Sequence, residues 1–117
     1  MPLVVVNKGN CRIPKAEFDG LISYLPVVVA TALTTYENPD GKLKPADVEV
    51  WVHNPNSHDV GSDKVQIVIF ANLYPERAAN LDERRKQITR NIRKTFPSLN
   101  IYGWVWILLA PGSFGEF

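Results

Sequence analysis

The chain has 117 residues, of which 45% are hydrophobic and 21% charged, and its formal net charge is +1. This length favours a single domain with its own core. The small net charge argues against strong attraction to nucleic acid or to an anionic membrane. Cys11 is the only cysteine, which excludes an internal disulfide. The longest apolar runs are far shorter than the ~20 residues that span a bilayer, and the N-terminus lacks a signal-peptide pattern. A cytoplasmic protein is expected.

The first half of the chain predicts a strand, a helix and a strand. The run "PLVVV" at residues 2–6 is rich in β-branched residues and predicts a strand. Apolar residues recur at helical spacing over 14–35, where Pro14 suits a first turn and Pro26 predicts a kink. The segment "LPVVVA" within it is also compatible with a strand. Alternation in "DVEVWVH" predicts a strand over 47–53, with Trp51 on one face.

The second half repeats this order. "KVQIVIFANLY" predicts a strand over 64–74. Residues 80–96 predict a helix with Asn80 as N-cap and Glu83 at the capping-box spacing. "LNIYGWVWILLA" predicts a last strand over 99–110 that is apolar on both faces. The buried stripe of the helix is expected to consist of Leu81, Ile88, Ile92 and Phe96.

The predicted fold class is α/β, as a two-layer α+β sandwich of duplicated β-α-β units. Two helices would cover one face of a four-stranded mixed sheet. The whole chain, 1–117, would form one domain with pseudo-repeats at about 1–60 and 64–117. The other sheet face would carry Trp51, Trp104 and Trp106, and an open apolar face predicts oligomerisation.

The second half resembles the repeating unit of the tautomerase superfamily. A strand leads into "YPERAANLDERRKQITRNI", and a second strand leads into "LLAPGSFGEF". The 4-oxalocrotonate tautomerase unit has a Gly-Arg-Ser turn before a charged helix, and Arg77 falls at that arginine. Its Ala-x-Gly-x-Phe-Gly hairpin matches Ala110, Gly112, Phe114 and Gly115. The tail is also similar to that of the cis-3-chloroacrylic acid dehalogenase group, whose glutamate aligns with Glu116.

The resemblance implies an enzyme that needs no cofactor, is a homotrimer, and uses an N-terminal proline exposed by methionine removal. Pro2 follows Met1 and is the matching residue. Its free amine would have a reference pKa of about 7.7–8.0, and burial or a nearby guanidinium would lower that pKa toward a neutral base. Arg77 would bind a carboxylate or a developing enolate oxygen. The substrate would be a small carboxylate or enol.

Three further residues are candidates for substrate binding. Arg12 lies near the place of a second family arginine, Phe114 would line the pocket, and Glu116 would orient or protonate a water in a hydratase-like variant. Each also has a simpler reading, as a surface arginine, a packed phenylalanine and a solvated carboxylate. Gly103 replaces a substrate-binding arginine of the family, and the first helix lacks the histidine of the dehalogenase group, which argues against dehalogenation.

Other polar residues predict no additional chemistry. His53 and His58 lack a further close ligand other than Asp59 and Asp63, so no metal site is expected. Two acids precede the basic residues of the helix over 80–96, which fits the helix dipole and a solvated face better than nucleic-acid binding. Three alternatives to a tautomerase remain at this point. They are a dehalogenase or hydratase variant, a non-catalytic oligomeric module that keeps Met1, and a ferredoxin-like domain with the same element order.

Overall fold

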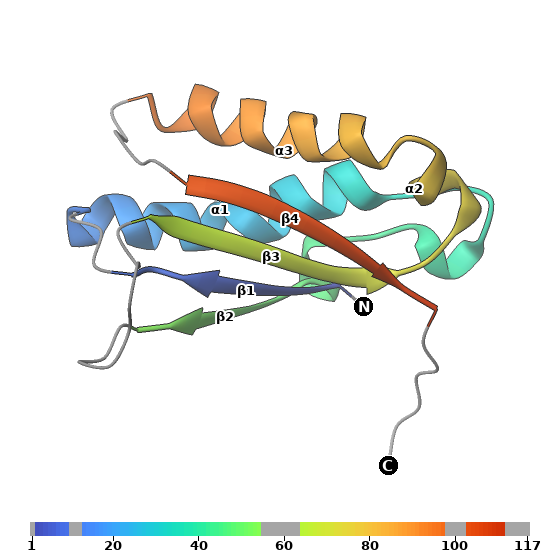
Figure 1. Ribbon diagram of the computed structural model, residues 1–117, viewed down its shortest axis with the longest axis horizontal. Helices are drawn as coiled ribbons and strands as arrows, with labels where there is room; N and C mark the ends of the chain where they lie inside the picture. The colour runs from blue at the N-terminus through green and yellow to red at the C-terminus, as the bar shows by residue number, and fades with distance from the viewer. Residues whose placement is uncertain (1, 10–12, 55–63, 98–102, 112–117) are drawn as a thin grey trace, which may run out of the picture.

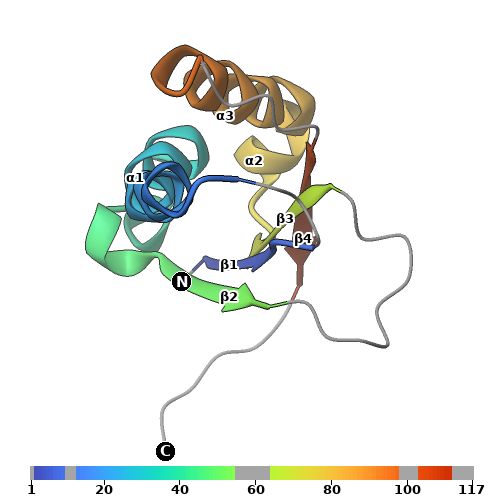
Figure 2. The same ribbon diagram turned by 90° about the vertical axis from the view of Figure 1, so that its left-hand side faces the viewer.

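The computed structural model describes residues 2–9, 13–54, 64–97 and 103–111. Within these ranges the order of the main elements is β-α-β-β-α-α-β. Four strands form one sheet, and the helices lie together on one of its faces (Figures 1 and 2). The strands are β1 (Leu3–Asn7), β2 (Glu49–His53), β3 (Val65–Asn72) and β4 (Gly103–Ala110). The helices are α1 (Lys15–Leu33), α2 (Pro75–Ala79) and α3 (Leu81–Thr95).

The sheet has the strand order β2-β1-β3-β4. The pairs β1–β2 and β3–β4 are parallel, and the central pair β1–β3 is antiparallel. Each helical crossover therefore joins two neighbouring parallel strands. A ferredoxin-like, split β-α-β arrangement would separate those strands, so the sheet order excludes that alternative. The predicted two-layer sandwich with a four-stranded mixed sheet is confirmed.

The helix α1 forms the centre of the core. Eight of its 19 residues are buried, among them Leu21, Leu25 and Val29. It continues through Pro26, so "LPVVVA" is helical and not a strand. By length and composition alone α1 could cross a membrane. Its packing on the sheet and against α3 explains its apolar character as that of a core helix.

The predicted helix over 80–96 is present, with differences at its start. The short helix α2 precedes it, in a segment expected to be a turn. Asn80 stands at the N-cap position of α3, but its side chain makes no capping bond to the backbone, so the capping-box prediction is wrong. Ile88 is fully buried, and the other three residues of the predicted stripe are partly buried against the core: Leu81, Ile92 and Phe96.

The helix-facing side of the sheet is buried, and the opposite side is apolar and open. Alternate residues of β3 are buried beneath the helices. Strand register aligns Trp51, Val5, Val68 and Trp106 in one row across the open side. We use the term open face for this side, whose apolar residues are Leu3, Val5, Trp51, Val68, Phe70, Trp104, Trp106 and Leu108.

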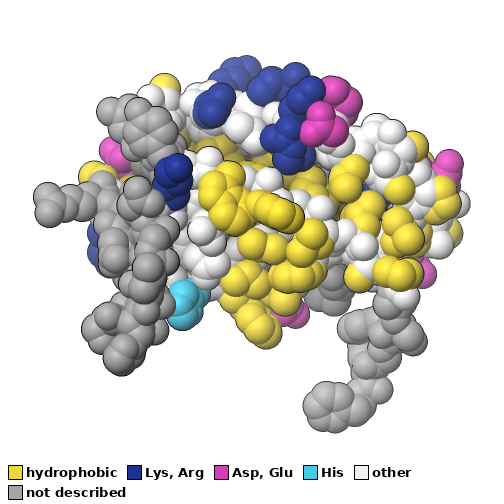
Figure 3. Space-filling model, in the orientation of Figure 1, with side chains coloured by type: hydrophobic (Ala, Val, Ile, Leu, Met, Phe, Trp, Pro, Cys, Tyr) yellow, Lys and Arg dark blue, Asp and Glu magenta, His cyan; other side chains and the backbone are white. Residues whose placement is uncertain are grey.

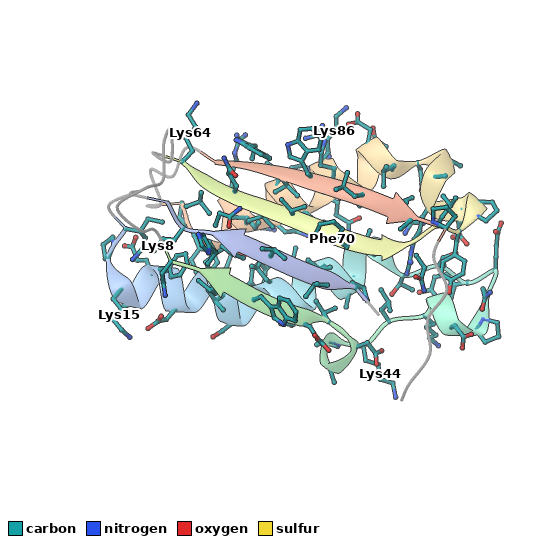
Figure 4. All side chains as sticks on the ribbon, turned by 60° about the horizontal axis from the view of Figure 1, so that its bottom comes forward. Lys8, Lys15, Lys44, Lys64, Phe70 and Lys86 are labelled. Atoms are coloured by element: carbon teal, nitrogen blue, oxygen red, sulfur yellow. The ribbon has the colours of Figure 1, made fainter. Side chains whose placement is uncertain are left out.

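Several of these residues are exposed to a degree unusual for large apolar side chains. Trp51 is 60% exposed and Trp106 54% exposed. In Figure 3 hydrophobic side chains form a continuous area across the middle of the view, with Lys and Arg side chains above it along α3. Figure 4 looks onto the sheet with α1 and α3 behind it, and Phe70 is labelled in the second half of β3. The predicted apolar open face is confirmed.

Candidate functional site

Pro2 lies directly before β1, a strand that occupies a central position in the sheet. Its side chain is buried, and its carbonyl accepts a hydrogen bond from the Glu49 backbone N–H at 3.1 Å. A proline has no backbone donor, and the first position of a strand does not require one. The residue is therefore held in place through its carbonyl, while its nitrogen contributes nothing to the sheet.

The strand register shows which segments meet near Pro2. Leu3, the next residue, pairs with Glu49 on one side and with Phe70 on the other. The chain continues past β3 to Leu73, whose N–H donates to the Ala110 carbonyl at 3.0 Å. Pro2 thus lies at the end of the sheet where the strands β3 and β4 end and β2 begins (Figure 1). Exposed apolar side chains at this end include Phe70, Leu73 and Leu108.

Arg77 lies in α2 and is almost completely buried. Its Nε donates to the Leu33 carbonyl at 2.7 Å, and its two terminal nitrogens donate to the carbonyls of Asn72 and Gly41 at 3.0 and 3.5 Å. The guanidinium also lies over the Tyr74 ring, 4.8 Å from the centroid. Burial lowers the pKa of Arg77 from its ordinary value. These contacts give Arg77 a structural role and do not support the predicted binding of a substrate anion.

Arg84 lies beside Arg77 and also donates hydrogen bonds to backbone carbonyls. It is buried, its Nε donates to the Asn80 side-chain oxygen at 2.7 Å, and one terminal nitrogen donates to the carbonyls of Ala32 and Thr34 at 3.0 and 2.8 Å. The last carbonyls of a helix have no partner within that helix, and basic side chains near them also oppose the helix dipole. The two arginines therefore cap the C-terminal end of α1 from the second half of the chain.

Glu76 completes this polar cluster. Its carboxylate accepts hydrogen bonds from the Thr35 hydroxyl and from the backbone N–H groups of Tyr36 and Glu37, and it lies 3.7 Å from Arg84. The bond from Thr35 is the main reason why the pKa of Glu76 is below its ordinary value. We call Glu76, Arg77 and Arg84 the α1 cap cluster. Each of these three side chains forms hydrogen bonds with backbone groups.

Sequence reasoning identified Arg77 but missed Arg84 and Glu76. A signal for Arg84 existed, because residues 81, 84, 88 and 92 recur at the spacing of one helix face, so Arg84 occupies a position of the buried stripe. No such signal existed for Glu76, whose partners lie about 40 residues away in the sequence.

The other predicted site residues, Arg12, Phe114 and Glu116, lie outside the described residues, as do Cys11 and His58. Their roles stay predictions. Among the described residues, no group of three or more His, Cys, Asp or Glu side chains is arranged to hold a metal ion.

Comparison with known proteins finds similarity in structure but not in sequence. No family model matches the chain, and no curated protein matches it. A native fused 4-OT matches with a TM-score of 0.63 and 15% identity over 97% of this chain and 91% of its own. N1, from the cis-3-chloroacrylic acid dehalogenase family, matches with a TM-score of 0.61 and 14% identity over 98% and 80%.

MIF2 of Leishmania major is similar as well, with a TM-score of 0.60 and 10% identity over 99% of this chain and 94% of its own. These structures are members of the tautomerase superfamily. At such low identity the likeness establishes the fold. The predicted resemblance to the tautomerase superfamily is thereby confirmed at the level of the fold.

Proposed function

We propose that this protein is a cofactor-independent keto–enol tautomerase whose general base and acid is the nitrogen of Pro2. The observation that carries the proposal is the position of Pro2. It is buried at the start of a central strand, at the end of the sheet where β3 and β4 end, and only its carbonyl forms a hydrogen bond with a neighbouring strand. The fold shared with a fused 4-OT and with N1 supports the same assignment.

The proposed chemistry requires the removal of Met1, since the nitrogen of Pro2 is otherwise an amide. Removal produces a secondary amine, and a buried site favours its neutral form. This amine accepts the hydroxyl proton of a small enol, and the resulting ammonium gives a proton to the neighbouring carbon. The carbon–carbon double bond becomes single while the carbonyl forms, so atoms and electrons balance. A 2-oxo acid undergoes the same steps in reverse.

We assign the binding of a substrate carboxylate to a group other than Arg77, because carbonyl oxygens occupy three of its nitrogens. Arg12 is the candidate that the sequence offers. Phe114 and Glu116 keep their proposed places at the pocket wall and beside a substrate water.

We also propose that the protein assembles as a homotrimer that covers the open face. Large apolar side chains on one contiguous sheet surface support this, because soluble monomers rarely expose such a patch. Replacing Trp106 by Lys should dissociate the assembly, whereas Tyr36→Lys should not, because Tyr36 is also exposed but belongs to the connection after α1. Sedimentation of the parent chain as a monomer at micromolar concentration would contradict the proposal.

The catalytic proposal is tested with three forms of the protein: trimmed, Met1-retained, and trimmed Pro2→Ala. Intact mass establishes which form is present, and ketonisation of phenylenolpyruvate is followed by absorbance. A positioned acid–base group contributes about 10²–10⁴-fold, so both altered forms should lose activity on that scale. Circular dichroism controls for an intact fold. Equal turnover by the Met1-retained form would show that Pro2 is not the base, whereas no turnover by any of the three forms would favour a non-catalytic module.

A further inference from the structure

A second candidate site lies at the other end of the sheet from Pro2. A cavity of about 80 Å³, partly open to solvent, lies between the last turns of α3 and the first residues of β3 and β4. Val65 and Gly103, which begin these strands, line it. Pro2 is near the opposite ends of the same strands, because Leu3 pairs with Phe70. The cavity is therefore separate from the proposed catalytic site, and a binding site there would be additional to the proposed function.

The walls of this cavity are mainly aliphatic. Val65 and Ile67 contribute from β3, Ile92 from α3 and Val105 from β4. An apolar cavity of about 150 Å³ holds benzene and excludes water. A cavity of about half that volume fits a chain of about three carbons, and burying each CH₂ group of such a chain is favourable.

One cationic side chain at the cavity has no partner among the described residues. Arg93 lines the cavity, is exposed, and makes no hydrogen bond or ion pair within the part of the chain that the structure describes. Thr89, four residues earlier on the same face of α3, also lines it. By contrast, three of the six basic side chains of α3 are engaged: Arg84 with carbonyls, and Arg85 and Lys86 with Asp82. An unpaired guanidinium matches a carboxylate, which it can bind with two parallel hydrogen bonds.

We propose that this cavity binds short aliphatic monocarboxylates, with the alkyl chain between α3 and the starts of β3 and β4 and the carboxylate on Arg93. The helix C-terminus carries partial negative charge, which would disfavour an anion. Arg93 and Lys94, both in the last turn, offset that charge. Binding of the monocarboxylate involves no chemical reaction and needs no second ligand.

The test is an NMR titration of the trimmed, full-length protein with sodium butyrate. Saturable shifts are expected at the amides of Val65, Thr89 and Val105, and not at Leu3 or Phe70. Butanol, which has the same chain without the charge, should bind more weakly, and so should acetate, which leaves the cavity unfilled. Octanoate exceeds the cavity and should also bind more weakly than butyrate. Because activity is not measured, the result is independent of the tautomerase proposal.

Variants separate the two parts of the site. Arg93→Gln should weaken butyrate roughly two- to fivefold, since the lost pair is a solvent-exposed one, and added salt should reduce the difference. Arg90→Gln is the matched control, because Arg90 is an exposed arginine of the same helix that lines a different groove. Val105→Ile partly fills the cavity and should weaken butyrate while leaving the fold unchanged.

Three outcomes would overturn the proposal. The first is the absence of saturable shifts at the cavity amides, and the second is equal affinity for butyrate and butanol. The third is an affinity that rises steadily from butyrate to octanoate, because this indicates adsorption on the apolar surface and not a cavity of fixed size.

Discussion

The two β-α-β halves of the chain follow the same path, but their helices are built differently. In α1 eight residues are buried, and no basic residue occupies its last turn. In α3 only Arg84 and Ile88 are buried, acids stand in its first turn and bases in its last. The helix α1 is therefore a core element held by packing, whereas α3 has a solvated face that complements its own dipole.

This difference explains the location of the α1 cap cluster. The carbonyls of Ala32, Leu33 and Thr34 lie at the end of α1, where the hydroxyl of Thr34 donates to the Ala30 carbonyl and not to any of these three. Arg77 and Arg84, from the second half, donate to all three. The duplicated topology therefore does not produce two independent units, because the second half satisfies the backbone of the first.

The largest expected effect comes from deleting core volume in α1. Leu25→Ala removes a fully buried side chain and should lower the free energy of unfolding by about 2–5 kcal/mol. Ile92→Ala, in α3, removes a partly buried side chain and should cost less than about 2 kcal/mol. Urea denaturation of both variants measures the difference. Equal losses would contradict the view that α1 carries the core.

The next effect tests the dependence of one half on the other. Arg77→Met keeps much of the side-chain volume but removes the Arg77 donors from the carbonyls of Leu33 and Asn72, and it should cost roughly 2 kcal/mol, about 1 for each. The Gly41 carbonyl still accepts from the Thr35 backbone N–H at 2.9 Å. The control is Arg85→Met, since among the described residues the Arg85 side chain donates hydrogen bonds only to Asp82, on the surface of α3. A variant as stable as the parent but impaired in turnover would return Arg77 to substrate binding.

The sequence was sufficient to predict the architecture because local patterns determine it. Alternation in β3 and β2, helical spacing in α1 and α3, and apolar residues on both sides of β4 each specify an element without distant information. The order of these elements, with short connections, then favoured paired β-α-β units. The position of Pro2 at a strand start followed from the same local reasoning.

The cluster around Arg77 could not be predicted in this way. A basic residue before a charged helix is ordinarily solvated, and no local pattern shows that Leu33 and Gly41, about 40 residues earlier, offer carbonyls to it. The resemblance to a family turn pointed to the same residue but to another role. The packing of the folded chain determines which distant polar groups meet, and the spacing of residues in the sequence does not reveal these partners.

A smaller effect is expected from pH, through Glu76. Because the pKa of Glu76 is lowered in the fold, chiefly by the Thr35 hydroxyl, the unfolded chain binds the proton more readily. The stability contributed by Glu76 is therefore present above its ordinary pKa of 4.5 and is lost as the pH falls through the lower folded value. Glu76→Gln should flatten this part of the stability profile, measured by thermal unfolding. An unchanged profile would show that other carboxylates cause the acid sensitivity.

The smallest expected effect concerns Asn80, and it separates two roles for one side chain. If Asn80 acted as an N-cap, Asn80→Ser would change little, because serine caps helices about as well as asparagine. In the structure its oxygen accepts instead from the buried Arg84 guanidinium at 2.7 Å. The shorter serine cannot reach that far, so the variant should lose about 1.5 kcal/mol, the contribution of a hydrogen bond to a charged group. Asn80→Asp keeps the acceptor and should lose none of this stability. Denaturant unfolding of the two variants decides between the roles: equal stability of Asn80→Ser and the parent would restore the capping interpretation and show that Arg84 is held by Glu76 and its carbonyl partners.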